Sequence, residues 1–377
     1  MAEIFPYGRP ATGEHLIGRE ETVKEILDLI RGGQSIVLTA PRKYGKTSVL
    51  IEVLKRLRKE EVFTGWVDIF DIPSREKLAE KIVISTLENK KISGEKIISL
   101  AKKGVQILKE SVQLKHIAEE GYEIVLSFAS PTDTDALLDE ALDFPEKFST
   151  RHKQKMFFAY DEFGDLIRMD GELIKKMRAK FQMQKNTTYL FSGSQETLMK
   201  KLFYDKGSAF FGFSRVIYLP KLPENPLQNY IQKMFKKNDV NISNEEASYI
   251  TSKTDCHPYY TQYLCQIIYL TLKDKRKEIN KQYIDACYKE VISLQKPYLD
   301  SLWERLMHES ILQLNICQHL ATGDPRSPYS FFDIRRQNVY RSLSGLVAKG
   351  ILTLKGKKYS FTDPLFKDYL RMRMGFI

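Results

Sequence analysis

The segment at residues 40–48, APRKYGKTS, carries residue types that hold phosphate groups. It follows an apolar run of strand length, SIVLT at 35–39, and leads into a helical pattern at 48–58. Gly45 lets backbone N–H groups close around phosphate oxygens, Lys46 reaches the β and γ phosphates, and Thr47 offers a hydroxyl to Mg²⁺. A strand, this loop and a helix together predict a P-loop nucleotide site. Its predicted nucleotide-binding residues are Ala40, Pro41, Arg42, Lys43, Tyr44, Gly45, Lys46, Thr47 and Ser48.

A second group of chemically useful residues follows another apolar run. Residues 155–160, KMFFAY, have strand length and end directly in Asp161 and Glu162. Nucleotide hydrolysis needs one carboxylate for the Mg²⁺ shell, which we assign to Asp161, and one to orient or deprotonate water, which we assign to Glu162. An Asp-Glu pair at a strand end can also be simply solvated. In combination with the P-loop, however, the pair predicts a hydrolytic site.

Composition limits the class of protein. A length of 377 residues suggests two or three domains, and 42% hydrophobic content suits packed cores. The net charge of +11 would attract nucleic acid or another polyanion, but it also suits a surface rich in lysine and glutamate. The four cysteines show neither C-x-x-C spacing nor a neighbouring histidine cluster, and no secretion signal or membrane-spanning run is evident. We therefore expect a cytoplasmic protein without a zinc site.

Elements that must position the two motifs alternate along the chain. We predict a helix at 20–30 and strands at 61–70, 155–160, 189–194 and 216–219. Strands that alternate with helices in this order are typical of a parallel α/β sheet. Helical patterns at 76–88, 97–119 and 134–144 predict a helical insertion at about 72–150. Within it, the lysine-rich residues 89–103 suit a solvated helix face or a nucleic-acid patch.

Three prolines near residue 223 mark a change of pattern. Residues 226–299 are helical in character, whereas the following segment has helices at 311–321 and 337–349 and a hairpin, ILTLK and KYSF, around Gly356. Two helices followed by a hairpin predict a winged helix. The predicted domains are therefore a core at 1–222, a helical lid at 223–305 and a winged helix at 306–377.

Several motifs together resemble the archaeal-type ATPase family. They are IGRE at 17–20, the P-loop, FFAYDEF at 157–163, FSGS at 191–194, FFGFSRVIYL at 210–219, CHPYY at 256–260 and DPLFKDYLR at 363–371. This family belongs to the STAND branch of P-loop NTPases, related to AAA+ and origin-recognition ATPases. The resemblance implies an AAA+-like parallel sheet sandwiched by helices, a helical lid and a C-terminal winged helix. It also implies bound ATP or ADP with Mg²⁺, held between core and lid.

The resemblance also implies roles for residues outside the P-loop. Ser192 or Ser194 corresponds to the position that senses the γ-phosphate, and Arg215 to an arginine before the last core strand that acts in catalysis. His257 and Pro258 match a Gly-His-Pro lid motif that contacts nucleotide. Each has a plainer interpretation: a strand-end turn, a surface ion pair, and the packing of a helix start. Ala40 and Cys256 depart from family glycines, the latter affecting the lid contact.

Two functions fit these features. The first is a slow ATPase switch in which nucleotide positions the winged helix for a partner. The second is ATP-dependent binding of duplex DNA. Its candidate DNA contacts are Arg335, Arg336, Gln337, Asn338, Tyr340 and Arg341 on the recognition helix, with Lys355, Lys357 and Lys358 in the wing. Winged helices also bind proteins, so the residues leave both functions open, and a scaffold that binds nucleotide without hydrolysis is disfavoured by Glu162.

Overall fold

The fold is taken from a computed structural model of the chain. The structure describes residues 4–89, 112–117, 121–126, 134–169, 171–194, 196–275 and 279–376. They divide into two compact units, and each is considered by itself. The core unit comprises residues 21–40 and 46–219, and the C-terminal unit comprises residues 1–20, 41–45 and 220–377.

A five-stranded parallel sheet forms the centre of the core unit. Its strands are β1 (Ile36–Thr39), β2 (Phe63–Asp68), β5 (Met156–Asp161), β6 (Thr187–Gly193) and β7 (Arg215–Tyr218), in the order β2-β5-β6-β1-β7. All neighbouring pairs run parallel. Numbered within this sheet alone, the order is 2-3-4-1-5, which is that of a P-loop ATPase of AAA+ type. The predicted fold class is therefore confirmed.

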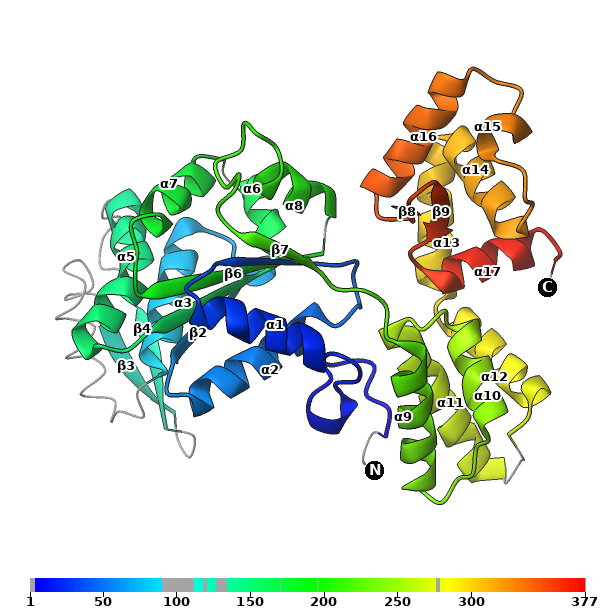
Figure 1. The fold of residues 1–377 in the computed structure, drawn as a ribbon, viewed down its shortest axis with the longest axis horizontal. Helices are drawn as coiled ribbons and strands as arrows, with labels where there is room; N and C mark the ends of the chain where they lie inside the picture. The colour runs from blue at the N-terminus through cyan, green and yellow to red at the C-terminus, as the bar shows by residue number, and fades with distance from the viewer. Residues whose placement is uncertain are drawn as a thin grey trace. The chain divides into compact units, whose positions relative to one another are not determined.

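Helices cover both faces of this sheet. Figure 1 shows α1 (Glu20–Arg31) and α2 (Lys46–Lys59) on one side, and α5 (Thr134–His152), α7 (Gly171–Phe181) and α8 (Glu196–Phe203) on the other. α3 (Arg75–Leu87) and the short α6 (Leu166–Met169) complete the helices of this unit among the described residues. β5 is apolar up to its last residue, Asp161, because both faces of the sheet are covered.

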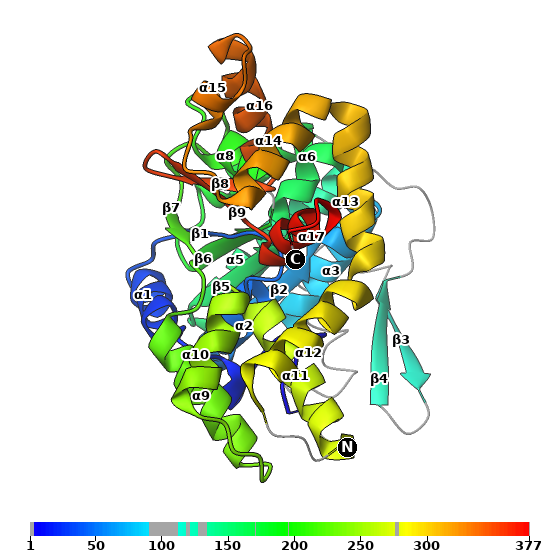
Figure 2. The same cartoon turned by 90° about the vertical axis from the view of Figure 1, so that its right-hand side faces the viewer.

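A hairpin replaces part of the predicted helical insertion. β3 (Val112–Ile117) pairs antiparallel with β4 (Gly121–Leu126), and Figure 2 shows this hairpin projecting away from the sheet. The predicted helix at 97–119 is therefore wrong over β3, where apolar and polar residues alternate with the period of a strand. The helices predicted at 76–88 and 134–144 are present as α3 and α5. Residues 90–111, including most of the lysine-rich segment, lie outside the described residues.

The C-terminal unit is mainly helical. α9 (Glu224–Lys236), α10 (Asn244–Lys253), α11 (Pro258–Lys275) and α12 (Lys281–Leu294) form one group of helices (Figure 1), and α13 (Lys296–Glu309) follows them. Next come α14 (Ile311–Thr322), α15 (Pro328–Phe331), α16 (Arg336–Ala348), the hairpin β8 (Leu352–Lys355) and β9 (Lys358–Phe361), and α17 (Pro364–Arg373). The helices and hairpin expected of a winged helix are present. The domain boundaries at 222 and 305 remain predictions.

An N-terminal arm, residues 4–19, belongs to the C-terminal unit. Phe5 is fully buried, and its backbone N–H donates to Gln266 Oε1 at 3.0 Å. Gly18 has φ of +58°, and a Cβ at this position would lie 2.5 Å from Pro223 Cγ. The arm is therefore fixed at both ends by residues more than two hundred positions away in sequence.

Two further properties of the described residues bear on location. None of their helices has the length and apolarity required to cross a membrane. The four cysteines, all within the described part of the chain, are free thiols, and three of them are buried.

Candidate nucleotide site

The P-loop connects β1 to α2, and its lysine begins the helix. Lys46 is the first residue of α2, and its buried ammonium donates to the Ala40 carbonyl oxygen at 3.2 Å. Ser48 is also buried in the first turn of α2. Gly45 has φ of +89°, a backbone conformation open to glycine and strained for other residues. The loop thus presents a helix amino terminus and a lysine, the two features that attract phosphate.

Asp161 lies beside the P-loop threonine. The Thr47 hydroxyl donates to Asp161 Oδ2 at 2.9 Å, and Asp161 is almost completely buried at the carboxyl end of β5. Mg²⁺ is usually held by one or two protein oxygens together with phosphate oxygens and water. Thr47 and Asp161 supply such a pair of oxygens and therefore fit this ion. The described residues contain no group of three or more His, Cys, Asp or Glu suited to holding a metal by themselves.

Glu162 is fixed by the end of the neighbouring strand. Its Oε2 accepts two hydrogen bonds from Ser194, one from the backbone N–H at 3.0 Å and one from Oγ at 2.8 Å. Glu162 also has φ of +49°, a left-handed conformation that is uncommon for a residue with a side chain. The strained backbone and the two bonds together hold the carboxylate toward β6, near Asp161.

The two candidate sensor serines occupy different surroundings. Ser194 contacts Glu162, whereas Ser192 is fully buried within β6. The Ser192 hydroxyl has no hydrogen-bond partner among the described residues. Of the two, only Ser194 is brought to the carboxylates.

Asp68 is a third carboxylate at this edge and was not among the predicted site residues. It ends β2 directly opposite Asp161 in the strand register. Burial raises the pKa of Asp68, and the neighbouring Asp161 and Glu162 raise it further. Its position after an apolar run is the signal that could have identified it, since adjacent parallel strands end at the same edge of the sheet.

The tip of the P-loop, residues 41–45, packs within the C-terminal unit. Lys43 adopts φ of +64° and places its ammonium 3.9 Å from the ring centroid of Tyr259, a cation–π contact. The Tyr44 ring packs edge-on against His257 with centroids 4.9 Å apart, and its hydroxyl donates to the Thr362 carbonyl oxygen at 3.3 Å. Two adjacent P-loop residues therefore contact both the start of α11 and the segment before α17.

His257 is a buried neutral imidazole. Burial lowers its pKa to about 3, and the nearby Lys221 and Lys43 act in the same direction. Pro258 is the first residue of α11, the position at which proline suits a helix. Cys256, where the resembling family has glycine, has φ of +52°. The structure thus gives His257 a packing role against Tyr44, and nucleotide contact by His257 and Pro258 remains a prediction.

Asp363 links the same region to the last helix. It caps α17 by accepting from the Leu365 and Phe366 N–H groups at 2.9 and 3.2 Å. Its other oxygen accepts from the Tyr260 hydroxyl at 2.6 Å. Burial raises the pKa of Asp363, and the charge of Lys43 opposes this shift. The motif DPLF contained the signal for this residue, but its partners are far away in sequence.

Arg19, from the motif IGRE, also binds the tip of the P-loop. Its guanidinium Nη2 donates to the Tyr44 carbonyl oxygen at 3.1 Å. Burial lowers the pKa of Arg19 to about 10, so it remains charged at neutral pH. The motif is visible in the sequence, but no pattern there indicates that its arginine binds the loop backbone.

Arg215 lies away from these groups within the core unit. It is the first residue of β7 and pairs in register with Ile36, the first residue of β1. The P-loop leaves the other end of β1, about 10 Å further along at 3.3 Å per residue. Exposed Arg215 instead forms an ion pair with Glu25 at 3.3 Å. The surface ion pair considered as its plainer interpretation is therefore present.

The candidate DNA contacts lie on α16 and the hairpin. Exposed side chains include all six of the α16 group, Arg335, Arg336, Gln337, Asn338, Tyr340 and Arg341, together with Lys357 and Lys358. The side chain of Lys355 lies outside the described part of the chain. The structure thus leaves these eight side chains accessible to a partner.

Comparisons with known proteins identify the architecture. No protein-family model and no curated protein matches the chain. The Walker-type ATPase of Pyrococcus abyssi matches at a TM-score of 0.68 with 16% identity, covering 98% of this chain and 99% of that one. The ORC2 protein of Aeropyrum pernix, in ADPNP-ADP complexes, matches at a TM-score of 0.61 with 11% identity. The match covers 99% of this chain and 98% of the ORC2 chain. At these identities the comparison concerns the fold: the chain shares, over nearly its whole length, the fold of the Pyrococcus abyssi Walker-type ATPase and of the Aeropyrum pernix ORC2 protein.

Proposed function

We propose that this protein is an ATP-binding, slowly ATP-hydrolysing switch whose nucleotide state positions the C-terminal winged helix for a partner. The observation that carries the proposal is the contact of Lys43 and Tyr44 with the start of α11 and with Thr362, the residue before the cap of α17. The loop that would enclose phosphate is thereby joined to α11 and α17, the helices that would move. Nucleotide binding changes the loop's surroundings and so acts on both helices.

The core unit supplies the groups for hydrolysis. Lys46 and the α2 amino terminus bind the phosphates, and Thr47 with Asp161 would hold Mg²⁺. Bound there, Mg²⁺ would neutralise charge on the β and γ phosphates. Glu162 orients the attacking water and accepts its proton. To do so it must exchange its bonds to Ser194, and this requirement supports a low turnover.

ATP and ADP are the nucleotides we propose. The Aeropyrum pernix ORC2 protein, which shares the fold, is described in complexes with ADPNP and ADP. We also propose a cytoplasmic location, which agrees with the four free thiols.

Hydrolysis is tested with wild type, Lys46→Ala and Glu162→Gln. Wild type is expected to release phosphate from ATP at a low, Mg²⁺-dependent rate. Lys46→Ala is expected to lose binding, and Glu162→Gln to bind ATP without hydrolysing it. Hydrolysis that survives Lys46→Ala would refute the assignment of this site.

Coupling to the winged helix is tested by hydrogen exchange of the amides at the start of α17. Exchange of Leu365 and Phe366, whose N–H groups Asp363 caps, is expected to differ between ATP-bound, ADP-bound and nucleotide-free protein. Tyr44→Phe keeps the ring in the P-loop and removes only the hydroxyl that donates to the Thr362 carbonyl oxygen, so exchange at α17 is expected to respond less to nucleotide. Lys46→Ala serves as the control without nucleotide. An unchanged exchange in wild type would refute the switch and leave the ATPase assignment standing.

A second candidate function is ATP-dependent binding of duplex DNA. It is favoured by the exposure of three arginines, Arg335, Arg336 and Arg341, on one short segment beginning α16. Binding of a labelled duplex would be measured at increasing salt, with Arg335→Ala/Arg341→Ala as the variant. Weaker binding and a shallower salt dependence in the variant would support this function.

A further inference from the structure

Three surface concavities in the C-terminal unit join end to end. The middle one has a volume of about 1100 Å³ and lies between α10 and α12 on one side and the β8–β9 hairpin and α17 on the other. It shares Tyr249 and Ser252 with a second concavity of about 820 Å³. It shares Ser327 and Tyr329 with a third of about 630 Å³ at the start of α16. We call this continuous surface the groove.

Unpaired lysines line the middle of the groove. Its acidic residues are largely neutralised: Asp285 pairs with Lys253 at 2.7 Å, Asp324 with Arg326 at 2.5 Å, and Asp368 with Arg371 at 3.5 Å. Asp255 pairs with Lys221. Four lysines that line it form no ion pair with any described residue: Lys289, Lys357, Lys358 and Lys367. They come from both walls, so an anion in the groove would be flanked by positive charge.

Tyrosines line the same groove as these lysines. Tyr249 stands at one junction, and Tyr329 at the other, where Tyr359 hydrogen-bonds to it and Tyr340 lies close by. Tyr340 is 59% exposed. Aromatic rings spaced between cations along a groove stack unpaired bases while the cations bind phosphates.

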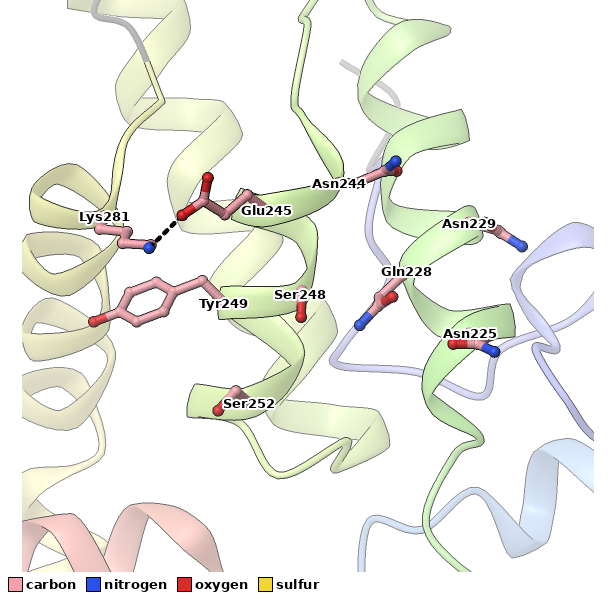
Figure 3. Close-up of a pocket in the computed structure, with 9 residues that line it drawn as sticks. All are labelled: Asn225, Gln228, Asn229, Asn244, Glu245, Ser248, Tyr249, Ser252 and Lys281. Atoms are coloured by element: carbon pink, nitrogen blue, oxygen red, sulfur yellow. Dashed lines mark hydrogen bonds and ion pairs between the residues drawn. The ribbon is translucent and has the colours of Figure 1, made fainter.

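The far end of the groove carries uncharged hydrogen-bonding groups. Figure 3 shows Gln228 on α9 pointing toward the part of α10 that carries Ser248. Asn225 and Asn229 on α9 and Asn244 on α10 line the same concavity. Lys281 there is paired with Glu245. Amides both donate and accept hydrogen bonds, as base edges and sugars require.

We propose that this groove binds a single strand of nucleic acid, with phosphates at Lys289, Lys357, Lys358 and Lys367 and bases on the tyrosines. The inference goes beyond the switch and does not depend on nucleotide hydrolysis. It also differs from duplex binding, because it uses α12 and α17 in addition to the α16 region. Nucleic acid fits better than an acidic protein segment, because the rings and amides suit bases as well as phosphates.

The test uses the full chain and a labelled single-stranded oligonucleotide of about 20 nucleotides. The variant Lys289→Ala/Lys367→Ala removes one free lysine from each wall. The matched control Lys24→Ala/Lys236→Ala removes two exposed lysines from α1 and α9, outside the groove, with the same loss of charge. Fluorescence anisotropy at several salt concentrations gives both the affinity and its salt dependence.

Wild type and control are expected to bind the single strand alike. The groove variant is expected to bind about tenfold more weakly or worse at about 0.1 M salt, with the salt slope reduced by about 1.4, or about 0.7 for each phosphate contact. Its ATP hydrolysis and its binding of duplex DNA are expected to stay unchanged. This separates the proposal from the switch and from duplex binding.

Three results would overturn the proposal. The first is an absence of single-strand binding by wild type at low salt. The second is equal weakening in the groove variant and the control, which would reduce the effect to net charge. The third is displacement of the oligonucleotide by poly-glutamate as effectively as by unlabelled strand, which would assign the groove to an acidic protein segment.

Discussion

His257 makes the stability of the C-terminal unit depend on pH. Burial lowers the pKa of its imidazole to about 3, whereas an unfolded chain has a value of about 6.5. Folding therefore favours the neutral form. The resulting contribution to stability is complete above pH 6.5 and is lost progressively as the pH falls from 6.5 toward 3.

The loss of stability at pH 5 depends little on the pKa that His257 has in the folded protein. At pH 5 the imidazole of the unfolded chain is almost entirely protonated, and this protonation stabilises the unfolded state by about 2 kcal/mol. The imidazole of the folded protein stays neutral for any pKa well below 5. Lowering the pH from about 7.5 to 5 should therefore cost about 2 kcal/mol through His257 alone. In a domain of about 150–250 residues this corresponds to about 4–8 °C in melting temperature.

The two tryptophans make the measurement specific. Trp66 lies in β2 of the core unit and Trp303 in α13 of the C-terminal unit. In a Trp66→Phe background, Trp303 fluorescence follows the unfolding of the unit that contains His257. A Trp303→Phe background follows the core unit, where His257 should have no effect.

The comparison is between His257→Gln and the exposed control His308→Gln, each unfolded by urea at pH 7.5 and pH 5. His257→Gln should remove about 2 kcal/mol of the acid sensitivity reported by Trp303, whatever it does to stability at neutral pH. His308→Gln should behave as wild type, because an exposed imidazole is solvated in both states. Equal acid sensitivity in wild type and His257→Gln would refute the assignment of a buried neutral imidazole.

Three other changes give separable outcomes. Gly18→Ala places a Cβ 2.5 Å from Pro223 Cγ at φ of +58° and should destabilise the C-terminal unit by about 1–3 kcal/mol; an unchanged Trp303 unfolding midpoint would contradict this. Cys256→Gly relieves φ of +52° and should be about 1 kcal/mol more stable than Cys256→Ala, measured in the same way; equal stability would argue against strain. Arg215→Ala, which removes the ion pair with Glu25, should leave the rate of ATP hydrolysis in dilute protein within about twofold of the wild-type rate. Loss of ATP hydrolysis at every protein concentration would instead show that Arg215 acts at the nucleotide site of its own chain.

The core fold was predictable because its signals are local. Gly45, Lys46 and Thr47 lie together in sequence, and β5 is a continuous apolar run that ends in its two carboxylates. Both motifs and the parallel sheet follow from such short patterns. The β3–β4 hairpin was missed because its alternating residues were interpreted with the period of a helix.

The connections between distant segments could not be predicted. The contact of Tyr44 with Thr362 joins residues 318 positions apart, and that of Arg19 with the Tyr44 carbonyl depends on a backbone atom that every residue has. The apolar run before Asp68 indicates a strand end, but that this end lies beside Asp161 follows only from the strand register. Side-chain identity gives no signal for such partners, because burial and three-dimensional proximity decide them.

The N-terminal arm also determines the order in which the chain can fold during its synthesis. Phe5 and Gln266, which share a hydrogen bond, are separated by 261 residues. At about 5–20 residues per second, a ribosome needs about 10–50 s to make the second after the first. The core unit ends at residue 219 and can form in the later part of that interval, while Phe5 still lacks its partner. The start of the arm is therefore a part of the nascent protein to which a chaperone would have a long opportunity to bind.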